Sequence, residues 1–488
     1  MRDGTKLMNL ILFNPDELRA ESIGCYGHPL APTPNIDRFA SQGVRFDQCH
    51  AQHPVCTPSR CSFMTGWYPH VRGHRTLWNP LRADEPNLMR SLREAGYEMV
   101  WGGKNDTLSP EAFAASVDDF RLGDRSGRPP AGPGGRNPFA ADDPRHASFL
   151  YESAVSRIED LADHRTVEGA IAYLKSRPKR PFAMWLSLSF PHPPYYAPRP
   201  WRDLIDPDRL PPLRPAGLAN KPDFHALIRR SRRLDEIDPE MMRTINAVYL
   251  GMIGVVDHWF GALLAALEES GLQEETAVVL FSDHGDWAGD YGLVEKWPSA
   301  LDDTMTRVPL IVRLPGGAAG QVVREPVELL DVPATLLGLA GSAPAYPQFG
   351  RDLGPQLRGA AGDPERCAFA EGGYDPHEPL SFEGRVDSDP IFKDPTHIYY
   401  PKGRLQQDCP TSVCRATMVR SMTHKLIHRR LGVSELYDLR SDPHELDNRY
   451  DDPALGDARA DLERRMLEWF QRTSDVTPGD RQPRGFPA

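Results

Sequence analysis

LMNLILF, residues 7–13, is the stretch of sequence that decides the fold. It is an almost unbroken apolar run, the pattern of a strand buried on both faces of a parallel sheet. Four similar runs follow along the chain: YEMVWGG (97–103), FAMWLSLSF (182–190), TAVVLFS (276–282) and VPLIVRL (308–314). Helical patterns in residues 85–96 and 244–271 lie between these runs, and each ends at a Gly. Strands that alternate with helices predict an α/β fold, in which helices sandwich a large, mixed and mostly parallel sheet.

The pattern changes past residue 360. Short strand-like segments such as ATMVRSMTHKLIHRR (416–430) and SELYDL (434–439) precede a helical segment, DARADLERRMLEWFQRT (457–473). We therefore predict a main domain over residues 1–360 that carries the site, and a smaller unit over 361–488 with a small antiparallel sheet and a helix. Looser segments at 105–180, 195–240 and 375–410 are expected to shape the mouth of a pocket.

The composition excludes some classes of partner. The chain has 488 residues, and 57 Lys+Arg against 68 Asp+Glu give a net charge of −11, which argues against nucleic acid or an anionic membrane as a partner. No run reaches the ~18 apolar residues of a membrane span. The start lacks the pattern of a signal peptide and the 7 cysteines are sparse and odd in number, so we expect a cytoplasmic protein, or a secreted or periplasmic one if a signal peptide has been removed. The sequence does not decide whether the protein forms a homo-oligomer.

Polar side chains follow several of the predicted strands. In an open α/β sheet, ligands bind beyond the carboxyl ends of the strands, so these residues are expected to meet at one edge. Carboxylates with one imidazole suit Ca²⁺, Mg²⁺ or Mn²⁺ better than Zn²⁺, although acids at strand ends can also cap the next helix. The candidate metal ligands are Asp16, Glu17, Asp283 and His284, and the candidate anion-binding residues are Lys104, His192 and Lys296.

Cys56 lies in PVCTPSRCSFMTG (54–66), where a turn leads into a helix. The positive end of the helix dipole, with Arg60 on the first turn, favours an anionic nucleophile or ligand there. Cys61 lies on another face and is expected to pack in the core. A thiolate enzyme with His53 as the base remains open from the residues alone.

Several motifs resemble those of one known family. The stretch Cys56-Thr57-Pro58-Ser59-Arg60, followed by Thr65-Gly66, resembles the C-x-P-S-R…T-G motif of type I sulfatases, in the alkaline-phosphatase superfamily. Other segments match in the same order: YGHPLAPTPNIDRFASQGVRF (26–46), GYEMVWGGK (96–104), PHPPYYAP (191–198), SDHGDWAGDYGLVEKW (282–297), RVPLIVRLPG (307–316) and ELYDLRSDPHELDN (435–448). The resemblance covers nearly the whole chain to about residue 450.

The resemblance implies a sulfate ester hydrolase in which Cys56 is converted after translation to formylglycine. The hydrated formylglycine is the nucleophile, and one of its oxygens lies on a divalent cation, Ca²⁺ before Mn²⁺ or Mg²⁺. Arg60 would stabilise the diol, while Lys104, His192 and Lys296 would hold the sulfate oxygens. His192 or Lys296 would protonate the departing alcohol. The implied partners are a small-molecule or saccharide sulfate ester and, transiently, the enzyme that installs formylglycine.

The sequence departs from the family pattern at three places. Glu17 replaces the second Asp after the first strand, and His284 stands where many members have Asn. Asp106 replaces the His of K-x-H, which puts a carboxylate beside the substrate anion. HRTLWN (74–79) resembles the phosphonate monoester hydrolase branch of the superfamily, so Asn79 is a candidate substrate ligand, with an Asn-Pro turn as the alternative.

Three alternatives compete with the sulfatase hypothesis. The same site would also suit phosphonate monoesters or phosphodiesters. A binding protein in which Cys56 is never converted is the second alternative. A cysteine hydrolase is the third, and it predicts sensitivity to thiol alkylators and indifference to chelators.

Overall fold

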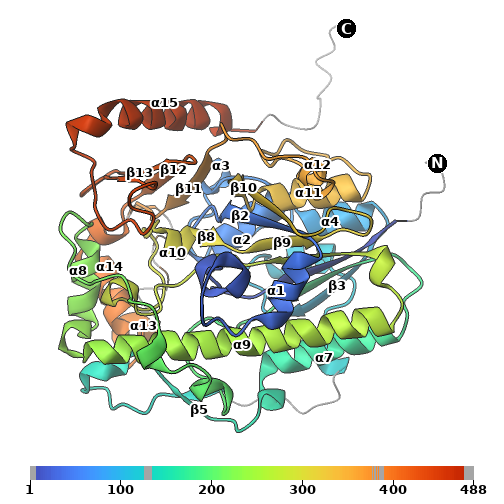
Figure 1. The fold of residues 1–488 in the computed structure, drawn as a ribbon, viewed down its shortest axis with the longest axis horizontal. Helices are drawn as coiled ribbons and strands as arrows, with labels where there is room; N and C mark the ends of the chain where they lie inside the picture. The colour runs from blue at the N-terminus through green and yellow to red at the C-terminus, as the bar shows by residue number, and fades with distance from the viewer. Residues whose placement is uncertain are drawn as a thin grey trace, which may run out of the picture.

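The chain is built around one large twisted sheet with helices on both faces (Figure 1). The computed structural model describes residues 7–125, 134–375, 377–378, 381, 383 and 389–476. The main sheet has eight strands in the order β10-β2-β9-β7-β1-β6-β3, with β8 paired to β2. Their bounds are β1 Asn9–Asn14, β2 Val44–His50, β3 Glu98–Gly103, β6 Phe182–Ser187, β7 Thr276–Phe281, β8 Arg307–Val308, β9 Leu310–Arg313 and β10 Gln321–Glu328.

The run that opens the sequence forms the centre of this sheet. β1 pairs in parallel with β6 on one side and β7 on the other. Leu10 and Leu12 pack in the core on one face, and Ile11 and Phe13 pack in the core on the opposite face, all without solvent exposure. The strand is therefore buried on both faces, as its apolar pattern predicts.

The sheet is mixed because two strands, β8 and β9, run against their neighbours. β9 is antiparallel to both β7 and β2, whereas β10 and β2 are parallel. This arrangement confirms the predicted mixed and mostly parallel sheet.

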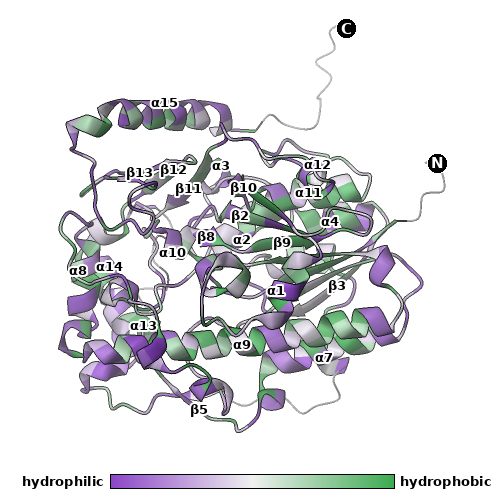
Figure 2. Ribbon diagram, viewed as in Figure 1, coloured by the Kyte–Doolittle hydropathy of each residue, from purple (hydrophilic) through white to green (hydrophobic). Residues whose placement is uncertain are grey.

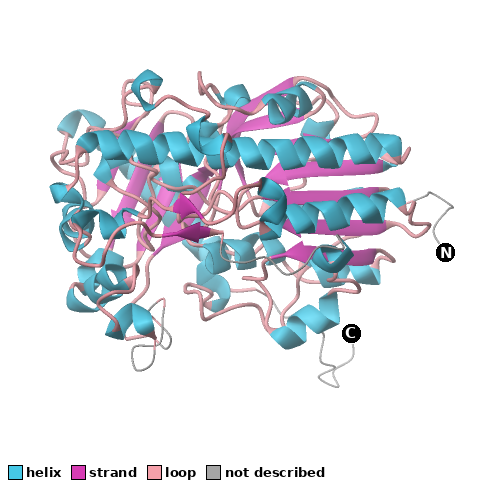
Figure 3. Cartoon of the chain, turned by 90° about the horizontal axis from the view of Figure 1, so that it is seen from below, coloured by secondary structure: helices cyan, strands magenta, loops and turns pink. Residues whose placement is uncertain are grey.

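Two layers of helices cover the sheet. α1, α7 and α9 contribute to the core on one face, and α2, α4, α5 and α11 to the core on the other (Figures 1 and 3). The helices are α1 Pro34–Ser41, α2 Cys56–Thr65, α3 Pro69–Arg72, α4 Leu88–Glu94, α5 Pro110–Ser116, α6 Leu122–Arg125, α7 Ala162–Lys175, α8 Phe224–Ser231, α9 Pro239–Glu269, α10 Asp303–Thr306, α11 Asp331–Leu339, α12 Gly354–Leu357, α13 Pro390–Lys393, α14 Tyr400–Asp408 and α15 Gly456–Thr473.

α9 is the one helix of the described residues that is long and apolar enough to cross a membrane by length and composition. In the fold, 72% of its most apolar window is buried, and its side chains pack with those of β1 and α7. Its apolar character is therefore accounted for by its place as the core helix of this layer (Figure 2).

The segments 105–180 and 195–240, which we expected to be loose, contain helices that their Pro- and Gly-rich surroundings obscure. α7 buries Val167, Ala170 and Leu174, a helical spacing, against the sheet and α9. α8 packs against the loop that follows β7 and against the C-terminal segment. Residues 126–133 of the first segment lie outside the described residues.

The C-terminal part forms a second, antiparallel sheet beside the first, as predicted. Its order is β11-β12-β13-β14, and α15 covers it (Figure 1). The bounds are β11 Ala368–Gly372, β12 Ala416–Arg420, β13 His424–Arg429 and β14 Glu435–Asp438, and the separate hairpin pairs β4 Gly135–Arg136 with β5 Glu152–Ser153. Between β11 and β12 the chain returns to the main domain through α13 and α14, next to the site described below.

Candidate active site

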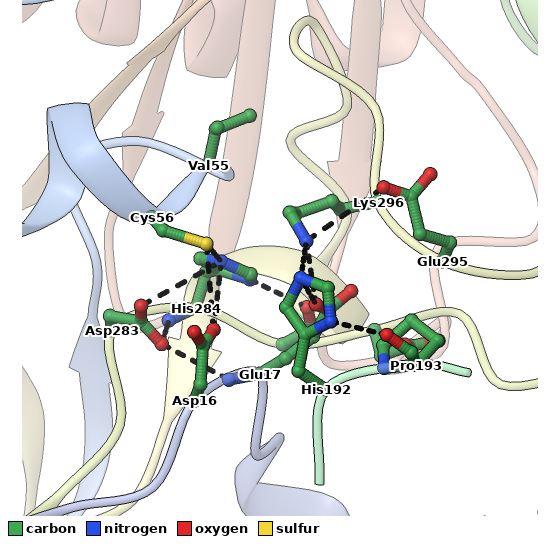
Figure 4. Close-up of polar contacts among 12 residues, drawn as sticks. Asp16, Glu17, Val55, Cys56, His192, Pro193, Asp283, His284, Glu295 and Lys296 are labelled. Carbon is green, nitrogen blue, oxygen red and sulfur yellow. Dashed lines mark hydrogen bonds and ion pairs between the residues drawn. The ribbon is translucent and has the colours of Figure 1, made fainter. Parts of the chain in front are cut away.

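Polar residues from separate segments meet at one edge of the main sheet (Figure 4). β1, β6 and β7 are parallel neighbours, so the residues that follow them emerge side by side. Gly103 ends β3 with φ +90°, and a Cβ there would lie 2.0 Å from the carbonyl oxygen of Ser187, so glycine permits this close approach before Lys104. The residues collected at this edge are Asp16, Glu17, Lys104, His192, Asp283, His284 and, from the loop after β7, Lys296.

Cys56 is the first residue of α2 and faces this cluster, as predicted. Its side chain is 2% exposed, and Sγ lies 3.1 Å from His284 Nε2 and 3.5 Å from Asp16 Oδ1. Burial raises the pKa of the thiol well above its usual value, and the neighbouring Asp16 carboxylate adds to the effect. The side chain is therefore a protonated thiol at neutral pH.

His53 does not act on Cys56 in this geometry. Its Nδ1 accepts a hydrogen bond from the backbone N–H of Val55 at 3.2 Å, and the imidazole beside the sulfur belongs to His284. The hypothesis that His53 is the base of a thiolate enzyme is therefore wrong for this arrangement. Cys61 packs in the core on the α2 side of the sheet, as expected.

Four side chains form a group that fits a divalent cation. One ligand atom from each of Asp16, Cys56, Asp283 and His284 lies within 4.8 Å of the others. His284 Nδ1 donates to the carbonyl oxygen of Gly285 at 2.9 Å, and burial lowers the pKa of His284, so Nε2 presents a lone pair to the group. Two carboxylates and one neutral imidazole are suitable donors for a hard cation such as Ca²⁺.

Glu17 differs from this group in its contacts. Its backbone has φ 67°, a left-handed conformation that is uncommon outside glycine, and its N–H donates to Asp283 Oδ1 at 3.0 Å. Its side chain turns to Lys296, with Oε2 2.7 Å from Nζ. Burial raises the pKa of Glu17, although Lys296 opposes the shift. The structure therefore places the Glu17 carboxylate between the candidate ligand Asp16 and the cation Lys296.

Arg60 fixes the two Asp side chains. It has no solvent exposure, and its Nε lies 2.8 Å from Asp283 Oδ2 while Nη2 lies 3.4 Å from Asp16 Oδ2. Nη1 donates to the hydroxyl of Ser187 at 2.6 Å. Burial alone would raise the pKa of Asp16, but Lys104 and Arg60 hold it well below its usual range. Arg60 thus lies behind the two carboxylates, pairs with both and helps to keep Asp16 ionised, which is an indirect position for a residue expected to contact the nucleophile.

Two lysines and a histidine line the open side of Cys56. Lys104 forms ion pairs with Asp16 and, at 2.8 Å, with Asp106. Lys296 Nζ donates to His192 Nε2 at 2.8 Å. Burial and the Lys296 charge lower the pKa of His192, whereas the neighbouring carboxylates Glu17 and Glu295 raise the pKa of Lys296 against the effect of burial. His192 is therefore neutral and Lys296 is charged.

These residues open onto a cavity of about 230 Å³. Its inner end is formed by Cys56, Lys104, His192 and Lys296. The outer wall is formed by Leu77, Asp106, Glu295, Glu383, Ile391, Tyr399, Lys402, Gly403 and Gln406. The C-terminal segment thus forms one wall of the site, as predicted for residues 375–410, of which residues 376, 379–380, 382 and 384–388 lie outside the described part.

Asn79 is not among the described residues that line this cavity. Its side-chain amide donates to the hydroxyl of Thr76 at 3.2 Å, and its carbonyl oxygen accepts from His74 at 2.7 Å. These contacts agree with the Asn-Pro turn, the alternative to a substrate ligand. Asp106, by contrast, does line the cavity.

Some site residues carried no signal in the sequence. Lys402 is 6% exposed and lies 2.8 Å from Glu295 and 3.1 Å from Glu383, a contact between distant segments that no motif indicates. Ser187 could have been predicted from the sequence, because it is the last residue of β6 and lies at the same edge of the sheet as the other strand ends.

The family model named Sulfatase matches residues 8–342, more than half of the chain. The chain belongs to the sulfatase family. As such it is a sulfuric ester hydrolase, in agreement with the resemblance of its motifs.

This sulfatase is similar in sequence to several known proteins and in fold to several solved structures. It is 28% identical over 517 aligned residues to the multifunctional alkaline phosphatase superfamily protein PehA of Trinickia caryophylli. The alignment covers 95% of this chain and 94% of PehA. It is 29% identical over 391 residues to iduronate 2-sulfatase of Mus musculus, over 69% of each chain. The fold is similar to that of the phosphonate monoester hydrolase of Agrobacterium radiobacter, with a TM-score of 0.72 at 22% identity over 96% of each chain.

Proposed function

We propose that this sulfatase hydrolyses sulfate monoesters with a formylglycine derived from Cys56 and one divalent cation, Ca²⁺ before Mn²⁺ or Mg²⁺. The observation that carries the proposal is the position of Cys56 at the start of α2, within reach of Asp16, Asp283 and His284 and facing the cavity. The hydrated formylglycine would supply a hydroxyl nucleophile at that position. The cation, held by Asp16, Asp283 and His284 with Glu17 nearby, would lower the pKa of an oxygen and neutralise anionic charge.

The remaining residues of the chain bind and orient the ester. Lys104 and Lys296 place two positive charges at the cavity end of Cys56, where the sulfate group would lie. Arg60 holds both Asp carboxylates at fixed positions through its ion pairs. Lys296 carries the proton that it shares with His192 Nε2, so this pair is placed to protonate the leaving oxygen.

The thiol properties favour this reading over a cysteine hydrolase. A nucleophilic cysteine needs a lowered pKa, and burial beside Asp16 raises that of Cys56. A silent binding protein would leave the metal-type ligand group and the two lysines without a role. Turnover that depends on a metal and resists iodoacetamide would support the proposal.

Phosphonate monoesters and phosphodiesters remain the second candidate substrates. They carry a single negative charge, as sulfate monoesters do, so the lysine pair suits both. The similarity to PehA, which is named as a multifunctional protein, supports phosphonate monoesters and phosphodiesters as the second candidate substrates. The test compares 4-nitrophenyl sulfate with 4-nitrophenyl phenylphosphonate after metal repletion. Hydrolysis of the phosphonate with no release of sulfate would overturn the proposal.

A further inference from the structure

A second cavity, of about 280 Å³, borders the first. Lys104 and His192 line both cavities, so the two are adjacent at the residues proposed to hold the sulfate group. A substrate bound there through its sulfate therefore has room to extend beyond the cavity that contains Cys56.

The walls of the second cavity are mainly apolar and well fixed. Phe190 and Tyr196 meet edge to face with ring centroids 5.5 Å apart, and Leu161 and Pro194 complete the apolar lining. Tyr196 packs against the backbone of Gly134, where an added Cβ would lie 2.1 Å from the phenol oxygen. Rigid aromatic rings of this kind provide a surface for the C–H face of a flat ring.

Besides Lys104, His192 and Ser189, two polar side chains line this cavity, Asp163 and Tyr196. Asp163 is 5% exposed, and its Oδ2 accepts hydrogen bonds from the N–H groups of Ser189 and Phe190, both at 2.8 Å. Asp163 Oδ1 and the Tyr196 hydroxyl have no hydrogen-bond partner among the described residues. One fixed acceptor and one hydroxyl, both unpaired in an apolar cavity, call for a ligand that carries hydroxyl groups.

We propose that the second cavity is a subsite for a neutral, hydroxyl-bearing ring, namely the next sugar unit of a saccharide sulfate ester. The proposal rests on the sulfate ester hydrolysis proposed above. A sugar hydroxyl would donate to Asp163 Oδ1, a second would pair with the Tyr196 hydroxyl, and the C–H face would lie on the aromatic rings. A ring with a second anionic group would be repelled by the Asp163 carboxylate, because Lys104, the cation of this cavity, is already paired with Asp16 and Asp106. A plain aryl ring would leave both polar atoms unpaired.

The experiment uses three aryl sulfates that differ only in the substituent opposite the sulfate. These are 4-methoxyphenyl sulfate, 4-(β-D-glucopyranosyloxy)phenyl sulfate and 4-benzyloxyphenyl sulfate. We expect kcat/KM of the glucosyl compound to exceed that of the methoxy compound by about ten-fold, the worth of one or two new hydrogen bonds. The benzyloxy compound should gain less than the glucosyl one.

Two variants locate the effect. Tyr196→Phe removes one hydroxyl, and Ala162→Phe fills the cavity from an exposed position at the start of α7. Both should lower the glucosyl-to-methoxy ratio of kcat/KM towards one, whereas Asp208→Asn, an exposed control, should leave the ratio unchanged. Thermal unfolding checks that each variant is folded.

A wild-type ratio near one, an equal gain from the benzyloxy group, or a ratio that both variants leave unchanged would overturn the subsite while the enzyme still turns over aryl sulfate. Failure to hydrolyse any of the three sulfates would overturn the proposed function itself, and the subsite with it.

Discussion

Lys296 Nζ donates a hydrogen bond to His192 Nε2 over 2.8 Å and lies 2.7 Å from Glu17 Oε2. Because His192 Nδ1 donates to the carbonyl oxygen of Pro193, Nε2 carries the lone pair and the shared proton resides on Lys296. The cavity therefore offers an ammonium group next to a neutral imidazole. In the proposed mechanism this pair supplies the proton to the leaving oxygen.

The first prediction concerns Lys296. Lys296→Met should lower kcat/KM by about 100-fold or more, the usual contribution of a general acid or charge stabiliser. The loss should be larger for alkyl sulfates than for 4-nitrophenyl sulfate, because nitrophenolate leaves without protonation. The measurement is kcat/KM for a series of esters that differ in leaving-group pKa.

Lys175→Met is the matched control, since Lys175 lies on the surface and its ion pair with Glu269 is exposed. An equal loss for all leaving groups in Lys296→Met would show that Lys296 only binds the anion and donates no proton.

The second prediction concerns the metal. Dialysis against a chelator should abolish turnover of 4-nitrophenyl sulfate, and Ca²⁺ should restore it. Asp283→Asn should lower the metal content of the purified protein, measured by inductively coupled plasma mass spectrometry, while Asp208→Asn should not. Full activity in metal-free protein would contradict the assignment of Asp16, Asp283 and His284.

The third prediction concerns a buried ion pair between the main sheet domain and the C-terminal sheet. Lys425 has no solvent exposure and lies 2.8 Å from Asp303 and 2.6 Å from Glu445. Lys425→Met should lower the free energy of unfolding by about 3–5 kcal/mol, because it leaves the buried Glu445 without this cation and Asp303 with only the longer contact of 3.6 Å to Arg420. Denaturant unfolding measures this loss, and a change below about 1 kcal/mol would contradict it.

The sequence predicted the site residues at the edge of the main sheet better than those of the outer cavity wall. Apolar runs located β1, β6 and β7, and the rule that ligands bind beyond strand ends placed Asp16, His192 and Asp283 together correctly. The motif around Cys56 supplied the position of the proposed nucleophile and the start of α2.

The outer wall was not predictable in the same way. Lys402 and Tyr399 reach the cavity from α14 and the residue before it, after the chain has left the main domain for β11. Such contacts depend on the return path of a loop, for which no periodicity or motif provides a signal. Asn79, suggested by a motif alone, instead forms a local turn with Thr76.

The fourth prediction concerns pH and Glu445. Burial raises the pKa of Glu445 from 4.5 to about 7, with Asp303 and Asp302 adding to the shift and Lys425 and Lys221 opposing it. Between these two pH values the folded protein keeps a proton that the unfolded chain releases, so this carboxyl contributes less stability as the pH rises. The difference in unfolding free energy between the wild type and Glu445→Gln should fall by about 3 kcal/mol from pH 4.5 to pH 7.

Denaturant unfolding at a series of pH values measures this difference. A difference that is constant with pH, or that grows as the pH rises, would show that the pKa of Glu445 is not raised in the folded protein.

The central claim is that Cys56 acts as formylglycine and not as a thiol. Trypsin releases residues 46–60, a peptide that contains both Cys56 and the internal control Cys49. The most direct measurement is the mass of this peptide, set against sulfate release from 4-nitrophenyl sulfate, in preparations made with and without a formylglycine-installing enzyme. Our account predicts a form lighter by ~18 Da at Cys56, with Cys49 unchanged, and an activity proportional to the fraction of that form. Full activity in protein whose Cys56 is entirely a thiol would contradict it.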